Sequence, residues 1–146
     1  MKTIVIAGGG KGVGKTSLAR SLGRLLPGCL VVKVGTGRQS GKKSEILFPF
    51  GTPYAKVAEA AEGSACLIIE SGAILDDPDL AADLVVVLPA PLGSPDKPGS
   101  QRRRARADLV RGEPISAGQA ELIRLRLGMD KSSFAALLAA VGAPVS

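Results

Sequence analysis

Residues 3–16 read TIVIAGGGKGVGKT, a short apolar run followed at once by glycines, lysines and a threonine. The apolar part, residues 3–7, is rich in β-branched side chains, as is typical of a strand buried on both faces of a parallel sheet. The part after it, residues 9–16, satisfies the pattern G-x-x-x-x-G-K-[ST], known as the P-loop. Residues 16–26 then repeat leucines at helical spacing, so the stretch predicts strand, phosphate-binding loop and helix in succession.

Each residue type in this loop has a physical task. The glycines allow backbone N–H groups to turn inward around phosphate oxygens, and the helix directs its positive end at the same anion. Lys15 is predicted to reach the β- and γ-phosphates, and the hydroxyl of Thr16 to bind Mg²⁺. The residues predicted to bind the nucleotide are Gly10, Lys11, Gly12, Val13, Gly14, Lys15, Thr16 and Ser17.

The rest of the chain alternates strand-like and helix-like segments. Further strands are predicted at residues 29–34, 66–70, 84–88 and 108–110, and helices at residues 53–62, 100–107, 116–127 and 131–141. Residues 35–44 and 89–99 are rich in glycine or proline and are predicted to be loops. Strands that alternate with helices favour the α/β class. We expect a three-layer α/β/α sandwich with a mainly parallel sheet, the P-loop NTPase fold, in one domain that spans residues 1–146.

Composition excludes several classes of function. The chain of 146 residues has no histidine, which removes imidazole bases and histidine-bound metal. Its two cysteines, Cys29 and Cys66, are too few for a cysteine-only zinc site and are expected to be buried and reduced. A net charge of +6 with only 3% aromatic residues favours phosphate ligands and makes a nucleic-acid partner improbable. No apolar run is long enough for a membrane span, and we expect a cytoplasmic location.

Glu70 closes the strand-like segment CLIIE at residues 66–70. A carboxylate at the carboxyl end of a buried strand faces the ligand crevice of a parallel sheet. P-loop proteins need an acid there for the Mg²⁺ shell. We therefore predict that Glu70, with Thr16, holds the metal, and that Glu70 and Lys15 are the catalytic residues. Asp76, Asp77 and Asp79 follow in a turn that is interpreted as mainly solvated, although one of them could approach the phosphates.

Three other basic residues are candidates for binding a substrate or anion: Lys33, Arg38 and Arg111. Lys33 lies on a buried strand, where an ammonium group is costly unless it meets an anion or reaches solvent at the strand end. Arg38 belongs to the 35–44 segment, which could close over a substrate or be a solvated loop. Residues 102–106 hold four further arginines, which cannot all share one face of a helix. They could bind a second anionic group, an acidic partner or nucleic acid, or form a solvated helix face.

The P-loop, Lys33 and the sequence Glu70-Ser71-Gly72 together resemble the SIMIBI class of P-loop NTPases. Within it the chain is similar to the group of the molybdopterin-guanine dinucleotide biosynthesis protein MobB and dethiobiotin synthetase. MobB-like proteins have an I-K-H-type segment on the second strand and a V-E-G segment on the third, where this chain reads VKVG (residues 32–35) and IESG (residues 69–72). The resemblance covers roughly residues 2–90. It implies an Mg²⁺-dependent ATPase or GTPase that assists cofactor biosynthesis, with a larger enzyme or a second copy as partner.

The chain departs from the proteins that it resembles in three respects. The strand histidine of MobB is absent, and Gly10 stands where the MinD/ParA branch has its signature lysine, one place before Lys11. No N-K-x-D guanine-reading motif occurs, since the last strand ends in VRG (residues 110–112). The choice between ATP and GTP therefore stays open. Two other functions also stay open: an ATP-dependent small-molecule kinase or ligase-like enzyme, and a nucleotide-gated adaptor without catalysis.

Overall fold

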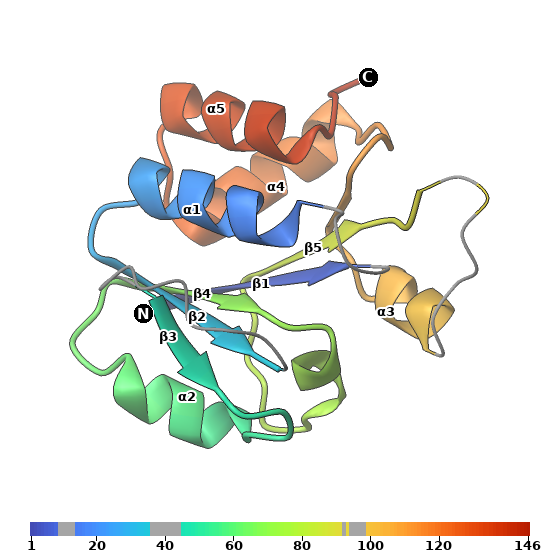
Figure 1. Cartoon of the computed structure of the whole chain (residues 1–146). Coiled ribbons are helices and arrows are strands. Elements are labelled where there is room, and N and C mark those ends of the chain that lie inside the picture. Colours follow the sequence, from blue (N-terminus) through green and yellow to red (C-terminus); the bar gives the residue numbers. More distant parts are fainter. Residues whose placement is uncertain (9–13, 36–44, 92, 94–98) are drawn as a thin grey trace.

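The computed structural model describes residues 1–8, 14–35, 45–91, 93 and 99–146 (Figure 1). Within these residues the strands form one parallel sheet of order β3-β2-β4-β1-β5-β6. The strands are β1 (Lys2–Gly8), β2 (Cys29–Val34), β3 (Glu45–Phe48), β4 (Cys66–Glu70), β5 (Leu84–Leu88) and β6 (Leu109–Val110). The helices are α1 (Lys15–Leu25), α2 (Tyr54–Ala60), the 3₁₀ turn η1 (Ala73–Asp76), α3 (Ser100–Ala105), α4 (Ala117–Leu127) and α5 (Lys131–Val141).

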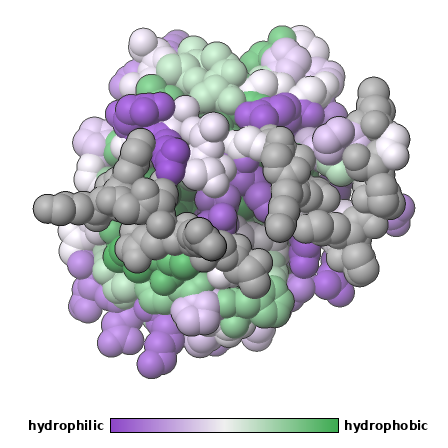
Figure 2. All heavy atoms as spheres, viewed as in Figure 1, coloured by the Kyte–Doolittle hydropathy of each residue, from purple (hydrophilic) through white to green (hydrophobic). Residues whose placement is uncertain are grey.

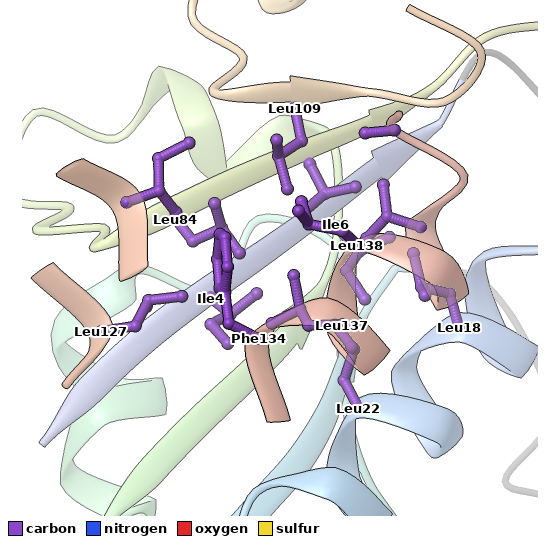
Figure 3. Close-up of a cluster of buried hydrophobic side chains, with 14 of the residues drawn as sticks. Ile4, Ile6, Leu18, Leu22, Leu84, Leu109, Leu127, Phe134, Leu137 and Leu138 are labelled. Atoms are coloured by element: carbon purple, nitrogen blue, oxygen red, sulfur yellow. The ribbon is translucent and has the colours of Figure 1, made fainter. Parts of the chain in front are cut away.

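Helices cover both faces of the sheet. Successive side chains of a strand point to opposite faces, so each strand contributes to two cores. Ile4 and Ile6 of β1 pack with α1, α4 and α5 on one face (Figure 3), whereas Val5 packs with α2 and η1 on the other. Strands β1, β4 and β5 contain only buried residues at their centres, which explains their continuous apolar sequence. The arrangement confirms the predicted three-layer α/β/α sandwich of the P-loop NTPase fold.

Most predicted elements are confirmed to within two or three residues, and the exceptions are short. The edge strand β3 was not predicted, because it has four residues and follows a polar, glycine-rich segment. Its pairing with β2 supplies the stability that its own sequence does not. The predicted helix at residues 53–62 is shorter, and Pro53 lies just before its first turn. The 3₁₀ turn η1 was also missed.

The two cysteines face each other in the register of β2 and β4. Both are free thiols, and Cys66 is buried while Cys29 is half-buried. The prediction of reduced cysteines agrees with this state, although Cys29 is more exposed than expected. A hydrogen bond between the two side chains, together with burial, raises the pKa of Cys66, and the same hydrogen bond lowers the pKa of Cys29.

Among the helices that the structure describes, none is long and apolar enough to cross a membrane.

The packing between α1 and the sheet predicts a large stability effect at Leu22. This side chain is fully buried against β1 and α5, so Leu22→Ala is expected to lower the free energy of unfolding by about 2–5 kcal/mol. Leu122→Ala is the matched control, because Leu122 is 66% exposed on α4 and its loss should change stability by less than about 0.5 kcal/mol. Urea unfolding of both variants measures the difference. Equal losses would contradict the described packing of α1.

Candidate functional site

The candidate site lies at the carboxyl edge of the sheet, where β1 and β4 end side by side. Lys15, which follows the last glycine of the P-loop pattern, begins α1. Glu70 ends β4 and is the register partner of Ile6 on β1. In open parallel sheets, ligands bind outside the carboxyl ends of the strands. Figure 2 shows hydrophilic side chains in the upper part of this molecular face and hydrophobic surface over the region of β3 below them. The described part of the predicted phosphate-binding segment, Gly14 to Ser17, thus shares this edge with the predicted acid.

The central contact of the site joins Thr16 and Glu70. The Thr16 hydroxyl donates a hydrogen bond of 2.8 Å to Oε1 of Glu70, across 54 positions of the sequence. Glu70 is only 5% exposed, so it is not a solvated acid at the end of the strand. A buried carboxylate is costly unless charged or polar groups compensate it. The fold therefore holds a carboxylate against the first turn of α1, directly beside the P-loop.

Lys33 provides the second contact of Glu70. Residues 33 and 70 are register partners on β2 and β4, and Nζ of Lys33 lies 4.0 Å from Oε1 of Glu70. The side chain of Lys33 is 38% exposed, so it reaches solvent at the strand end while it faces the carboxylate. The anion that Lys33 contacts in this structure is therefore Glu70. A second anion bound at the same edge would meet the exposed ammonium.

The donor set at this edge suits Mg²⁺ in chemical type. Thr16 and Glu70 supply a hydroxyl and a carboxylate oxygen within hydrogen-bond distance of each other, and hard oxygen donors are the ligands that Mg²⁺ prefers. Within the described residues, no three His, Cys, Asp or Glu side chains gather as a protein-only metal site. Mg²⁺ that is bound through nucleotide phosphates normally has few protein ligands, because phosphate oxygens and water complete its coordination shell.

Gly14 shapes the beginning of α1. Its φ of 92° and ψ of 18° lie in the left-handed region, and its carbonyl accepts the N–H of Leu18 at 3.0 Å. Gly14 has no side chain to cap the helix, and the first turn contains no acidic residue. The first N–H groups of a helix have no helical carbonyl to bind, and the helix dipole makes this end positive. The start of α1 therefore suits an anion.

Arg111, which was predicted to bind an anion, lies beside Gly14. Its Nε donates to the carbonyl of Val141 at 2.8 Å, so that it binds the carboxyl end of α5. A Cβ added at Gly14 would lie 3.3 Å from Nη1 of Arg111. The guanidinium thus joins the end of α5 to the beginning of α1, and adds positive charge to the phosphate side of the site.

The geometry at Gly14 predicts the outcome of adding a single methyl group. Gly14→Ala is expected to lower the free energy of unfolding by about 1–2 kcal/mol, because L-residues are strained at this φ and the methyl would crowd Arg111. Gly118→Ala is the control, since this glycine lies within α4 with open space around it. This variant should raise the free energy of unfolding by about 0.5–1 kcal/mol. Thermal unfolding of both variants checks the opposite signs. A stabilised Gly14→Ala would contradict the left-handed backbone at this position.

Five of the predicted site residues lie outside the described residues: Gly10, Lys11, Gly12, Val13 and Arg38. The described ones at the edge of the sheet are Gly14, Lys15, Thr16, Ser17, Lys33, Glu70 and Arg111.

The aspartates after β4 serve other elements. Asp77 accepts hydrogen bonds from the backbone N–H groups of Tyr54 and Asp79, at 2.7 and 2.9 Å, and so fixes the start of α2. These two bonds lower the pKa of Asp77. Asp76 forms an ion pair of 3.1 Å with Arg102. The interpretation of this turn as mainly solvated holds for Asp76 and Asp79, whereas Asp77 has a capping role.

One residue at the site was not singled out from the sequence. The guanidinium of Arg103, on α3, lies against Gly72, two residues after Glu70. A Cβ at Gly72 would be only 2.9 Å from Nη1 of Arg103. The run of arginines was visible in the sequence, but helical periodicity alone does not tell which of four neighbours faces the sheet. The prediction that they cannot share one face is confirmed.

Comparison with known proteins finds a likeness in structure rather than in sequence. No family model matches the sequence, and no curated protein sequence matches it. The structure is similar to the crystal structure of the hydrogenase maturation factor HypB from Archaeoglobus fulgidus, with a TM-score of 0.41 and 20% sequence identity. The likeness covers 98% of this chain and 78% of the other. At this similarity the assignment of function depends on the chain's own residues.

Proposed function

We propose that the chain binds a nucleoside triphosphate with Mg²⁺ and hydrolyses it slowly. The observation that carries this proposal is the 2.8 Å hydrogen bond between Thr16 and Glu70. It joins the last residue of the P-loop pattern to a buried acid at the end of a neighbouring strand, and P-loop NTPases need these two groups in the Mg²⁺ shell. The sequence motif alone would not require them to meet.

The chain's own residues bind the phosphates and stabilise the charge that develops on them. The N–H groups of the P-loop and the positive end of α1 hold the phosphates, and Lys15 neutralises the β- and γ-oxygens. Thr16 and Glu70 would hold Mg²⁺, which supplies a Lewis acid on the phosphate oxygens when bound. Glu70 is also an acid of this edge that could orient the attacking water. Without histidine, the expected intrinsic turnover is slow and open to stimulation by a partner.

The resemblance to the MobB and dethiobiotin synthetase group supports a more specific role. We infer an accessory NTPase in the biosynthesis of a molybdenum cofactor or a related cofactor, located in the cytoplasm. Its partner would be a larger enzyme of that biosynthesis, or a second copy of the chain. Both ATP and GTP are candidate nucleotides, because the guanine-reading motif is absent.

A small-molecule kinase or ligase-like enzyme is the second candidate, and the position of Lys33 favours it. Its ammonium group is partly exposed next to Glu70, where it could bind an anionic acceptor beside the terminal phosphate. A nucleotide-gated adaptor would use the same site without turnover.

The products distinguish these functions. The purified chain is incubated with Mg²⁺ and either ATP or GTP, and the amounts of released phosphate and of nucleoside diphosphate are compared. An NTPase releases both in equal amounts from nucleotide alone, which is the expected result. Diphosphate formed only after a carboxylate or alcohol acceptor is added would indicate the kinase or ligase. Binding of nucleotide without any turnover would indicate the adaptor, and absence of binding would contradict the proposal.

A further inference from the structure

We propose that Arg103 binds the terminal phosphate of the nucleotide, as an arginine that the chain supplies to its own site. This inference rests on the proposed function and adds a residue that lies outside the P-loop pattern. It is carried by the position of the guanidinium against Gly72 and by its Nε, which is buried and has no hydrogen-bond partner among the described residues.

The three consecutive arginines of α3 point to three different places. Arg102 forms an ion pair with Asp76 at 3.1 Å, and Arg104 forms one with Glu113. These two contacts fix the helix between η1 and the segment after β6 (Figure 1). Arg103, which lies between them, is directed at Gly72. Two of the three positive charges are thus neutralised by carboxylates, and the third is directed at the functional edge.

The guanidinium of Arg103 is partly buried without a matching anion. Its Nε has almost no contact with solvent and no hydrogen-bond partner, and no carboxylate in the described part of the chain pairs with the guanidinium. A buried donor without a partner is unfavourable, and a charged one more so. Such a group in a native structure calls for an explanation, and a bound ligand that completes its hydrogen bonds is one. An anion is the ligand that a guanidinium binds best, through paired N–H donors.

The position of Gly72 identifies the anion. Gly72 follows Glu70 by two residues, and the N–H of Ser71 between them donates to the carbonyl of Ile6 on β1. The guanidinium therefore lies at the ends of β1 and β4, the two strands that also carry the P-loop and the predicted Mg²⁺ acid. The terminal phosphate is the part of a nucleotide that Lys15, Mg²⁺ and an acid at this edge would surround. Glycine at residue 72 is required for this approach, because a side chain there would displace the guanidinium.

The test compares triphosphate with diphosphate binding. Calorimetric titrations use the Mg²⁺ complexes of the non-hydrolysable ATP and GTP analogues and of ADP and GDP. Arg103→Met keeps the length and apolar packing of the side chain and removes its charge. We expect it to weaken the binding of the triphosphate analogue about 10-fold or more, as for the loss of a charge-assisted hydrogen bond. The binding of the diphosphate should weaken less than about 2-fold. Arg106→Ala, an exposed arginine just after α3, is the matched control and should change neither.

Gly72→Ala is the second variant, which keeps the test valid if Arg103→Met unfolds. It retains the arginine but displaces its guanidinium, and its own φ of −81° accepts alanine. It is expected to reproduce the triphosphate-specific loss. Equal losses for both nucleotides, or no loss in either variant, would overturn the role of Arg103 and leave the proposed function intact. A wild-type chain that binds no nucleotide would overturn both.

Discussion

Replacing Glu70 by glutamine is expected to slow nucleotide hydrolysis by about 100- to 1,000-fold, the cost typical of removing one preorganised charge-stabilising group. Glutamine has the same shape, and its amide oxygen can still accept the hydrogen bond of Thr16. The change therefore removes the negative charge that would bind Mg²⁺ and orient water, and leaves the packing at the end of β4. Phosphate release at saturating nucleotide, measured over a series of Mg²⁺ concentrations, gives the loss in turnover and in metal dependence.

The control for Glu70→Gln is Glu59→Gln. Glu59 is an exposed residue of α2, so its charge should have no influence on turnover. Far-ultraviolet circular dichroism of both variants verifies that the fold is retained. A Glu70→Gln variant that hydrolyses nucleotide at the wild-type rate would show that the acid of this site lies elsewhere, and would remove the metal assignment.

Replacing Lys15 by alanine is expected to weaken the binding of a Mg²⁺–triphosphate analogue by about 10- to 100-fold, the cost of a lost charged hydrogen bond. Lys15 is the first residue of α1, where the positive end of the helix and an ammonium group would meet the same phosphates. Unlike Arg103→Met, this change should weaken diphosphate and triphosphate alike, since the P-loop lysine also contacts the β-phosphate. Calorimetric titration with both nucleotides measures the two losses.

Lys56→Ala serves as the control, because Lys56 is exposed on α2 and carries the same charge. It tests whether the net positive charge of the chain, rather than a defined site, attracts the nucleotide. Comparable weakening by Lys56→Ala and Lys15→Ala would mean that binding is a property of the basic surface. Unchanged affinity in Lys15→Ala would reject the P-loop as the binding site.

The layered fold followed from the sequence because its signals are local and strong. Strands β1, β4 and β5 are continuous apolar runs, which only a sheet covered on both faces explains, and the leucines of α1 repeat at helical spacing. The prediction failed for β3, which pairs on only one side and owes its conformation to β2. The aromatic residues near this strand are also divided between core and surface. Phe48 and Tyr54 pack on the sheet, while Phe50 is 71% exposed.

The sequence predicted the chemical role of single site residues, because that role follows from their neighbours in the chain. It could not predict which of these residues contact each other. The P-loop pattern and the strand-end position of Glu70 indicated Thr16 and Glu70 separately, but their hydrogen bond depends on two strands meeting at one edge. Arg103 could not be identified, because its role depends on the ion pairs that orient α3 and on a glycine 31 positions away. The sequence names the chemical groups, and the long-range packing decides which of them meet.

Nucleotide binding by the unmodified chain tests the central claim most directly. Calorimetric titrations with non-hydrolysable ATP and GTP analogues are made in Mg²⁺ and repeated after Mg²⁺ is removed with a chelator. The site formed by Thr16 and Glu70 predicts saturable binding of at least one analogue, which weakens when the metal is removed. No heat of binding for either analogue up to millimolar concentration, with the protein folded, would contradict the account.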